Sequence, residues 1–214
     1  MKEISNNTSF NLILLFTIVG EFFLPWILKY LYVGYNSKTM VMSVLGSPQS
    51  PVRTIYNLWL IWLGCFLTFT AIVYYFEFKK VSLILAILLF LSISIFAFGA
   101  GVLSGIFSVN EKKELNTLAS KIHGIGAAIG FMALLFFPLL NGIAAFKQAD
   151  MKSGILCTTA FIGALISFSF FIMGDKAQFK NTIFSYEGLW ERVTLFFMYI
   201  PFIYKAMDNI MPVR

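Results

Sequence analysis

The sequence predicts an all-α protein, a polytopic membrane helical bundle with six transmembrane helices. Of its 214 residues, 59% are hydrophobic and only 12% are charged, whereas soluble domains carry roughly 25% charged residues. A soluble fold of this size could not bury so much apolar surface, because only part of a small fold is interior. Lipid must therefore cover the rest. The apolar residues also come in runs of about 20, the length at which a helix crosses a bilayer.

Six runs reach this length, so we expect residues 1–214 to form a single six-helix transmembrane domain. The predicted helices are 10–31, 55–76, 81–105, 122–145, 154–173 and 189–206. The first run follows Lys2, as a signal peptide would, but it exceeds the apolar length of about 7–15 residues typical of such peptides and no A-x-A cleavage pattern follows it. We therefore expect the first run to be retained as a helix.

The connections between the runs differ in length and charge. Two are short and rich in lysine, 77–80 and 146–153, and three are longer, 32–54, 106–121 and 174–188. With six passes, the short connections lie on the same side as both termini. Basic short loops favour the cytoplasmic side, so we expect a multi-pass protein of the cell membrane with both termini cytoplasmic. The same rule accounts for the net charge of +6, which therefore does not indicate nucleic acid as a partner.

Small and aromatic residues mark the half that faces the long connections. Gly101 and Gly105 end the third predicted helix, while Gly126 and Gly130 open the fourth. Small residues at this spacing let two helices approach closely in lipid, so we expect close packing in this hairpin, with approach of a ligand as the alternative. The four tryptophans fall in the same half and fit an interfacial belt, although two of them, in the second helix, could sit deeper.

Glu21 is an ionisable residue near the middle of the first predicted helix. Such a group costs about 2.5–3.5 kcal/mol to insert into a membrane, so its presence needs a reason. Pro25 lacks the N–H that would bond the Glu21 carbonyl, so the same residue offers a carboxyl group and a freed carbonyl. Glu21 is either a ligand contact inside the bundle or a buried group that fixes helix packing.

Three more ionisable residues lie at the same end of the bundle. His123 is the only histidine and opens the fourth helix, while Glu187 and Glu191 stand four residues apart at the start of the sixth. Arg192 adjoins them at a helix N-terminus, where a cation is unfavourable and needs a partner. Capping and interfacial roles are the alternatives to a functional role for these residues. A lone histidine excludes both bis-histidine haem ligation within one chain and a multi-histidine zinc site.

The first long connection contains an apolar stretch, a glycine, two prolines and Arg53 at its end. This composition predicts an ordered, re-entrant or lid-like loop. Ser43, Ser47 and Ser50 are conceivable nucleophiles, but none lies in a G-x-S-x-G motif. No Walker motif, CxxC or H-E-x-x-H occurs either, so the sequence indicates neither a cofactor nor a metal.

Three short motifs give the chain a family resemblance. The first connection carries a Ser-x-Leu-Gly element, a proline, and an asparagine that enters the second helix. A Gly-x-Phe element precedes a His-Gly helix start, and Gly-Leu-x-x-Arg opens the last helix. The residues are Ser43, Leu45, Gly46, Pro51, Asn57, Gly105, Phe107, His123, Gly124, Gly188, Leu189 and Arg192.

With these motifs the chain resembles a bacterial and archaeal family of membrane proteins catalogued as domain of unknown function 998. The resemblance spans most of the chain and the order of the motifs agrees. It implies a six-helix fold and no assigned chemistry. Ser108 stands where the family pattern has proline, which puts the turn there in question.

Three functions are compatible with these residues. The first is a protein that binds a lipid headgroup or small amphiphile in an outward-facing polar pocket between the first, second, fourth and sixth helices, with membrane lipids as partners. Its ligand-binding residues would be Glu21, Arg53, His123, Glu187 and Arg192. The mixed signs suit a zwitterionic or phosphate-bearing group, because arginine holds phosphate through two hydrogen bonds.

The second function is a membrane-embedded hydrolase or transferase. Its catalytic residues would be His123 as general base with Glu187 or Glu191 orienting it, which requires hydrogen-bond distance between them. The third is a structural or accessory subunit in which the polar groups only hold helices together. It predicts that alanine at Glu21 or Arg192 lowers stability and changes nothing else.

Overall fold

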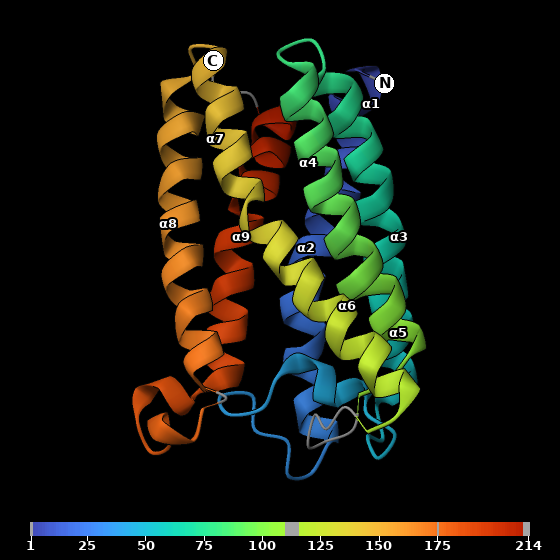
Figure 1. The fold of residues 1–214 in the computed structure, drawn as a ribbon. Helices are drawn as coiled ribbons and strands as arrows, with labels where there is room; N and C mark the ends of the chain where they lie inside the picture. The colour runs from blue at the N-terminus through green and yellow to red at the C-terminus, as the bar shows by residue number, and fades with distance from the viewer. Residues whose placement is uncertain (1, 110–115, 175, 212–214) are drawn as a thin grey trace.

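The described part of the chain is a bundle of long helices. The computed structural model describes residues 2–109, 116–174 and 176–211, and no strand occurs among them (Figure 1). The α-helices are α1 Lys2–Ser5, α2 Thr8–Leu28, α3 Arg53–Phe78, α4 Leu83–Phe96, α5 Ser104–Ile106, α6 Leu118–Leu135, α7 Phe137–Lys147, α8 Met151–Gly174 and α9 Glu187–Ile210. The π-helix η3 Ala97–Leu103 joins α4 to α5, and the 3-10 helices are η1 Lys29–Leu31, η2 Met42–Gly46, η4 Ala177–Phe179 and η5 Ile183–Ser185.

Five stretches of the described chain are long and apolar enough to cross a membrane. They are Thr8–Leu31, Arg53–Phe78, Leu83–Ile106, Leu118–Lys147 and Met151–Gly174. Each coincides, within a few residues, with one of the first five predicted helices. The all-helical, multi-pass membrane character predicted from the sequence is therefore confirmed. The sixth predicted helix corresponds to α9, which is as long as α8 but richer in charged residues.

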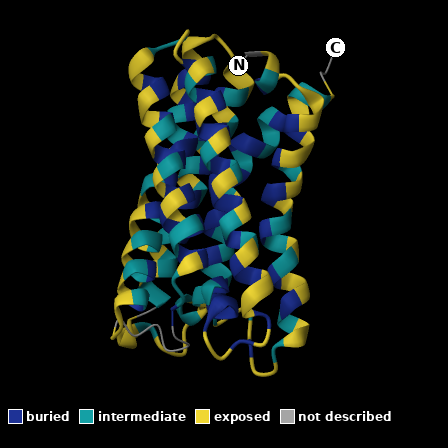
Figure 2. Cartoon of the chain, turned by 90° about the vertical axis from the view of Figure 1, so that its right-hand side faces the viewer, coloured by how far each residue is buried: buried dark blue, intermediate teal, exposed yellow. Residues whose placement is uncertain are grey.

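The two ends of the bundle differ in their connections (Figure 1). Both termini and the two tight turns, at 79–82 and 148–150, lie at one end, called here the terminal end. The first loop, residues 32–52, and the connection 176–186 lie at the other, called here the loop end. Exposed residues run along the outer faces of the helices from end to end (Figure 2). Many are large and apolar, such as Phe16, Ile84 and Ile155, as expected of faces that meet lipid.

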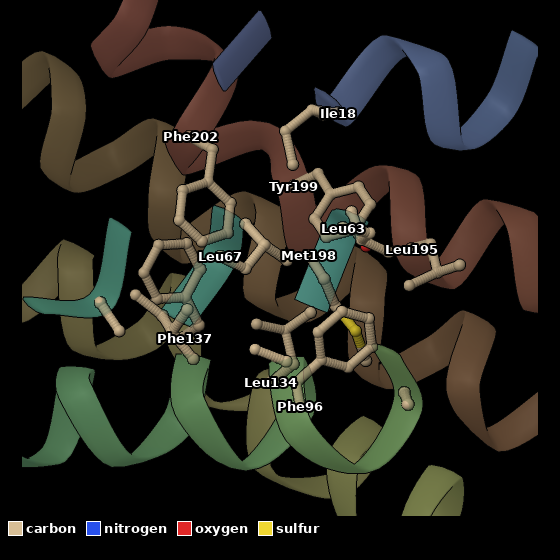
Figure 3. Close-up of a cluster of buried hydrophobic side chains, with 14 of the residues drawn as sticks. Ile18, Leu63, Leu67, Phe96, Leu134, Phe137, Leu195, Met198, Tyr199 and Phe202 are labelled. Atoms are coloured by element: carbon tan, nitrogen blue, oxygen red, sulfur yellow. The ribbon is translucent and has the colours of Figure 1, made fainter. Parts of the chain in front are cut away.

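Aromatic and aliphatic side chains fill the middle of the bundle (Figure 3). Phe137 of α7 and Phe202 of α9 stack with their ring centroids 4.1 Å apart. Tyr74 of α3 joins them from the side, 5.7 Å from Phe202. All three are fully buried, so this cluster ties α3, α7 and α9 together toward the terminal end.

The glycine pairs pack differently from the sequence prediction. Gly101 and Gly105 lie against α3, where an added Cβ at Gly101 would meet the α-carbon of Gly64 at 2.6 Å. Gly99 is the residue whose added Cβ would meet the Gly126 carbonyl on α6. The π-helical turns place more residues in each turn than an α-helix does, which rotates Gly101 and Gly105 away from α6 and onto α3. Close packing of this hairpin occurs, but through other partners.

Candidate functional site: a cavity toward the loop end

A cavity of about 350 Å³ lies among the helices toward the loop end. It is lined by α2, α3, the α4–η3–α5 segment, α6, α8, α9 and the first loop. The lining residues are Glu21, Val41, Met42, Ser43, Tyr56, Leu60, Leu63, Phe96, Ala100, Ser104, Val109, His123, Gly124, Ala127, Ala128, Phe131, Met132, Phe168, Phe171, Ile172, Glu187, Glu191 and Leu195. A volume of this size lies within the range of small-molecule sites in proteins.

The lining separates into a polar part and apolar walls. Glutamate, serine, tyrosine and histidine side chains come from the first turns of α6 and α9, from α2 and α3, and from the first loop. Leucine and phenylalanine side chains form the apolar walls; Leu63 and Phe131 lie deeper in the bundle, and Phe168 lies near the loop end of α8. An amphiphile has the same division between headgroup and chain.

Glu21 is held at the cavity by a tryptophan of α3. Its side chain is 3% exposed, and its Oε2 accepts a hydrogen bond of 2.7 Å from the Trp59 indole N–H. The neighbouring Gly20 makes this possible, because the Trp59 ring lies where a side chain at Gly20 would be. Trp59 is therefore a partner of the buried carboxyl group rather than part of an interfacial belt. Trp62 also reaches α2, donating to the Thr17 hydroxyl at 3.2 Å.

Glu191 fixes the first loop over the cavity. Its Oε2 accepts a hydrogen bond of 2.6 Å from the Met42 backbone N–H, at the start of η2. Val41, Met42 and Ser43 line the cavity from this side, and Leu45 is fully buried. The ordered, lid-like loop predicted from the sequence therefore lies at the polar part of the cavity.

Arg192 anchors the same loop from outside the cavity lining. Its guanidinium donates to the carbonyls of Ser37 at 2.9 Å and Gly188 at 2.6 Å and to the Tyr35 hydroxyl at 2.7 Å. Burial raises the pKa of Tyr35 to about 12, so this hydroxyl stays neutral and bonds onward to the Val41 carbonyl at 3.2 Å. The Glu191 carboxylate lies 4.0 Å from the same guanidinium, so the cation at this helix start is held by carbonyls of the loop and of α9, a hydroxyl and one carboxylate.

His123 opens the α6 wall of the cavity. Its Nδ1 lies 2.8 Å from the Phe107 carbonyl oxygen. A carbonyl only accepts hydrogen bonds, so Nδ1 carries the proton in this contact. This contact joins the Gly-x-Phe and His-Gly motifs, which are 16 residues apart in the chain.

Arg53 lies at the exposed start of α3, and its Nε donates to the Ser108 hydroxyl at 3.2 Å. The Asn57 side-chain amide donates to the same hydroxyl at 3.3 Å. Phe107 is extended after α5 ends at Ile106. Ser108, which departs from the family pattern, therefore accepts two hydrogen bonds from α3 and ties this turn to it.

The structure brings four of the predicted site residues to one cavity and leaves two outside it. Glu21, His123, Glu187 and Glu191 line the cavity, whereas Arg53 and Arg192 lie outside the lining. Sequence reasoning missed the Tyr56 hydroxyl and the walls formed by α4 and α8. Within an apolar run, the sequence does not distinguish a phenylalanine that lines a cavity from one that faces lipid.

The bundle and its cavity define a class: an α-helical, multi-pass membrane protein with an internal cavity that is polar at one part and apolar along its walls. Residues 17–207 match the family described as "Protein of unknown function (DUF998)", and the chain belongs to this family. The family resemblance found in the sequence is thereby confirmed, and the matched range includes every cavity-lining residue. No curated protein and no solved structure matches the chain.

Proposed function

We propose that this protein binds a membrane lipid or small amphiphile in the cavity, with the headgroup at the polar part and the chain along the apolar walls. The observation that carries the proposal is the division of a single cavity of about 350 Å³ into these two parts. A site for a polar small molecule would not need the phenylalanine walls, and a simple packing defect would not gather a histidine and three carboxyl groups.

The path of the chain supports six passes and a single domain over residues 1–214. Both termini lie at the same end of the bundle (Figure 1), and a chain that starts and finishes on one side crosses an even number of times. With α9 as the sixth pass, the lysine-bearing turns lie beside the termini, which favours a cytoplasmic terminal end in the cell membrane. The cavity then faces outward, with its polar part under the first loop.

A lateral opening gives an amphiphile a route from the bilayer. Ala128 and Met132 of α6 and Ile172 of α8 line the cavity and are also exposed on the outside of the bundle. Met132 is 49% exposed and Ile172 is 48% exposed. Small and flexible side chains at this position let a chain pass between α6 and α8 without unfolding the loop-end lid.

Purified protein tests the proposal by native mass spectrometry after extraction in mild detergent. We expect a lipid-sized molecule to remain bound, and matching lipids to raise the unfolding temperature. Ala127→Phe places a ring inside the cavity and should abolish both effects. Ile129→Phe places the same ring on the exposed face of the same helix and should preserve them. The proposal fails if no lipid is retained and no lipid class stabilises the protein.

A membrane hydrolase or transferase is the second candidate, and one observation favours it. The Phe107 carbonyl holds the His123 ring through Nδ1, and in a neutral ring protonated there Nε2 is the nitrogen that can act as a general base. Glu187 and Glu191 line the same cavity and would act with it. His123→Gln preserves an amide N–H for Phe107 but removes the base. The absence of lipid turnover in the unmodified protein, or turnover that survives this substitution, would exclude an enzyme with His123 as its base, while binding that survives it would leave the first proposal intact.

A further inference from the structure

The carboxyl group of Glu21 has no cationic side chain at ion-pair distance among the described residues. It lies in the middle of α2, within a stretch that is apolar enough to span the membrane. Trp59 occupies Oε2 with a neutral hydrogen bond, which supplies no charge. A carboxyl group at this depth is costly unless a partner offsets it, and this one also lines the cavity.

Tyr56 adds a second polar group to this part of the cavity lining. Its side chain is 2% exposed and lines the same cavity, one turn of α3 before Leu60. The hydroxyl makes no hydrogen bond to any residue in the described ranges. Hydroxyls inside a protein are normally hydrogen-bonded, so a hydroxyl on the wall of an open volume can take its partner from a ligand there.

The two arginines at this end are committed elsewhere. The Arg192 guanidinium donates to the carbonyls of Ser37 and Gly188 and to the Tyr35 hydroxyl. Arg53 is exposed and contacts Ser108. Neither lines the cavity, so the phosphate-binding arrangement expected from the sequence has no cation among the described lining residues. A phosphate here would face carboxyl groups.

We propose that the headgroup bound in this cavity is an amine, held as an ammonium by the Glu21 carboxylate with the Tyr56 hydroxyl as a second acceptor. This inference rests on the proposed amphiphile binding and names the chemical class of the ligand. An ammonium donates up to three hydrogen bonds and accepts none, which matches a carboxylate and a free hydroxyl. Its apolar chain lies against Leu63 and Phe131.

Three probes with the same twelve-carbon chain separate the headgroups: dodecylamine, dodecanol and dodecyl phosphate. Binding to the full-length protein is measured by native mass spectrometry and by the shift in unfolding temperature. We expect dodecylamine to bind more tightly than dodecyl phosphate by about tenfold or more, as for other buried charge pairs. Glu21→Gln keeps an oxygen that can accept the Trp59 hydrogen bond but removes the charge, and it should erase the preference for the amine.

Glu77→Gln is the matched control. Glu77 pairs with Lys205 at the terminal end, away from the cavity, and its substitution should leave the order of the probes unchanged. The headgroup inference is overturned if dodecyl phosphate or dodecanol binds as tightly as the amine, or if Glu21→Gln keeps the preference. In those cases amphiphile binding itself survives. If none of the three probes binds, both the inference and the proposed function fail. The comparison among probes on unmodified protein stands even if Glu21→Gln does not fold.

Discussion

The two ends of the bundle use the same helices for different purposes. Toward the terminal end, Tyr74, Phe137 and Phe202 pack ring against ring and are fully buried. Toward the loop end, the helices enclose an amphipathic cavity of about 350 Å³, closed by a polar-anchored loop. A smaller cavity of about 160 Å³ at the terminal end is lined largely by polar residues near the surface. The difference indicates that packed rings fill the terminal half, whereas the loop half leaves the volume that the proposed ligand would occupy.

A break in one membrane segment produces this difference. The long stretch Leu118–Lys147 divides into α6 and α7 around Phe136, with Pro138 in the first turn of α7. Proline is favoured in a first turn, where its missing N–H has no helical partner to lose. In Figure 1, α7 runs beside α8, whereas α6 leans away from it toward α5. The segment therefore packs tightly at one end and leaves room between α6 and α8 at the other.

The largest effect should come from the packed end. Phe137→Ala removes a fully buried ring stacked on Phe202 and should lower the free energy of unfolding by about 3–5 kcal/mol. Phe131→Ala, on the cavity wall six residues earlier, should cost roughly half as much, because one side of that ring already faces open volume. Unfolding in detergent micelles measures both. Equal losses would mean that the two halves are packed alike.

The polar anchor of the loop end should rank second. Arg192→Ala removes charged hydrogen bonds to Ser37, Gly188 and Tyr35 and should cost about 2–3 kcal/mol. Arg192→Lys keeps the positive charge but lacks the planar guanidinium with its several N–H donors, so we expect it to retain only part of this stability. Hydrogen exchange should show the loss concentrated in residues 35–42. A uniform loss over all helices would contradict the anchoring role.

Gly20→Ala tests how Trp59 is placed. The added methyl group would occupy the position of the indole ring, so the ring must move and its hydrogen bond to Glu21 is strained or lost. We expect a cost of about 1–3 kcal/mol together with a shift in tryptophan fluorescence. The control is Ile129→Ala on the exposed face of α6, which should leave the fluorescence unchanged. Gly163→Ala would not serve as a control, because Phe197 lies over that glycine.

The smallest effect should come from the turn before α8. Asp150 accepts from the Ser153 N–H at 3.1 Å and from its hydroxyl, so it caps the helix, and Asp150→Ala should cost about 1 kcal/mol. The Ser153 hydroxyl lowers the pKa of Asp150. Its contribution is therefore complete above the ordinary carboxyl pKa and is lost as the pH falls through the lowered value. Ser153→Ala should raise the Asp150 pKa measured by NMR. An unchanged pKa would remove the hydroxyl as its cause.

Much of this architecture could be predicted because lipid imposes strict costs. Apolar runs located all five of the described membrane stretches. The insertion cost of ionisable groups selected Glu21, His123, Glu187, Glu191 and Arg192, and all of these except Arg192 line one cavity. Burying a charge is unfavourable in any surroundings. An ionisable residue within an apolar run can therefore be recognised from the sequence alone, before its neighbours in space are known.

The direction of each side chain could not be predicted in the same way. Glu191 and Arg192 are consecutive, so they project roughly 100° apart around α9, and only one of them can face the cavity. Which one does so depends on how α9 is rotated against the first loop. The partnership of Glu21 with Trp59 likewise depends on the rotation of α2 against α3, since 38 residues separate the pair. These angles are set by packing between helices, which leaves no local trace in the sequence.

The π-helix η3 has a consequence for how the length of this segment can vary. Ala97–Leu103 includes Ala100 on the cavity wall and ends beside Ser104, whose hydroxyl donates to the Gly99 carbonyl at 3.0 Å. A π-turn accommodates an extra residue within a helix. Deleting one residue here would restore ordinary α-helical winding and leave the residues after it in their present positions, because the π-turn already holds the extra residue. The same deletion within α4 would turn everything after it by roughly 100°, so this stretch should tolerate the loss of one residue better than α4 does.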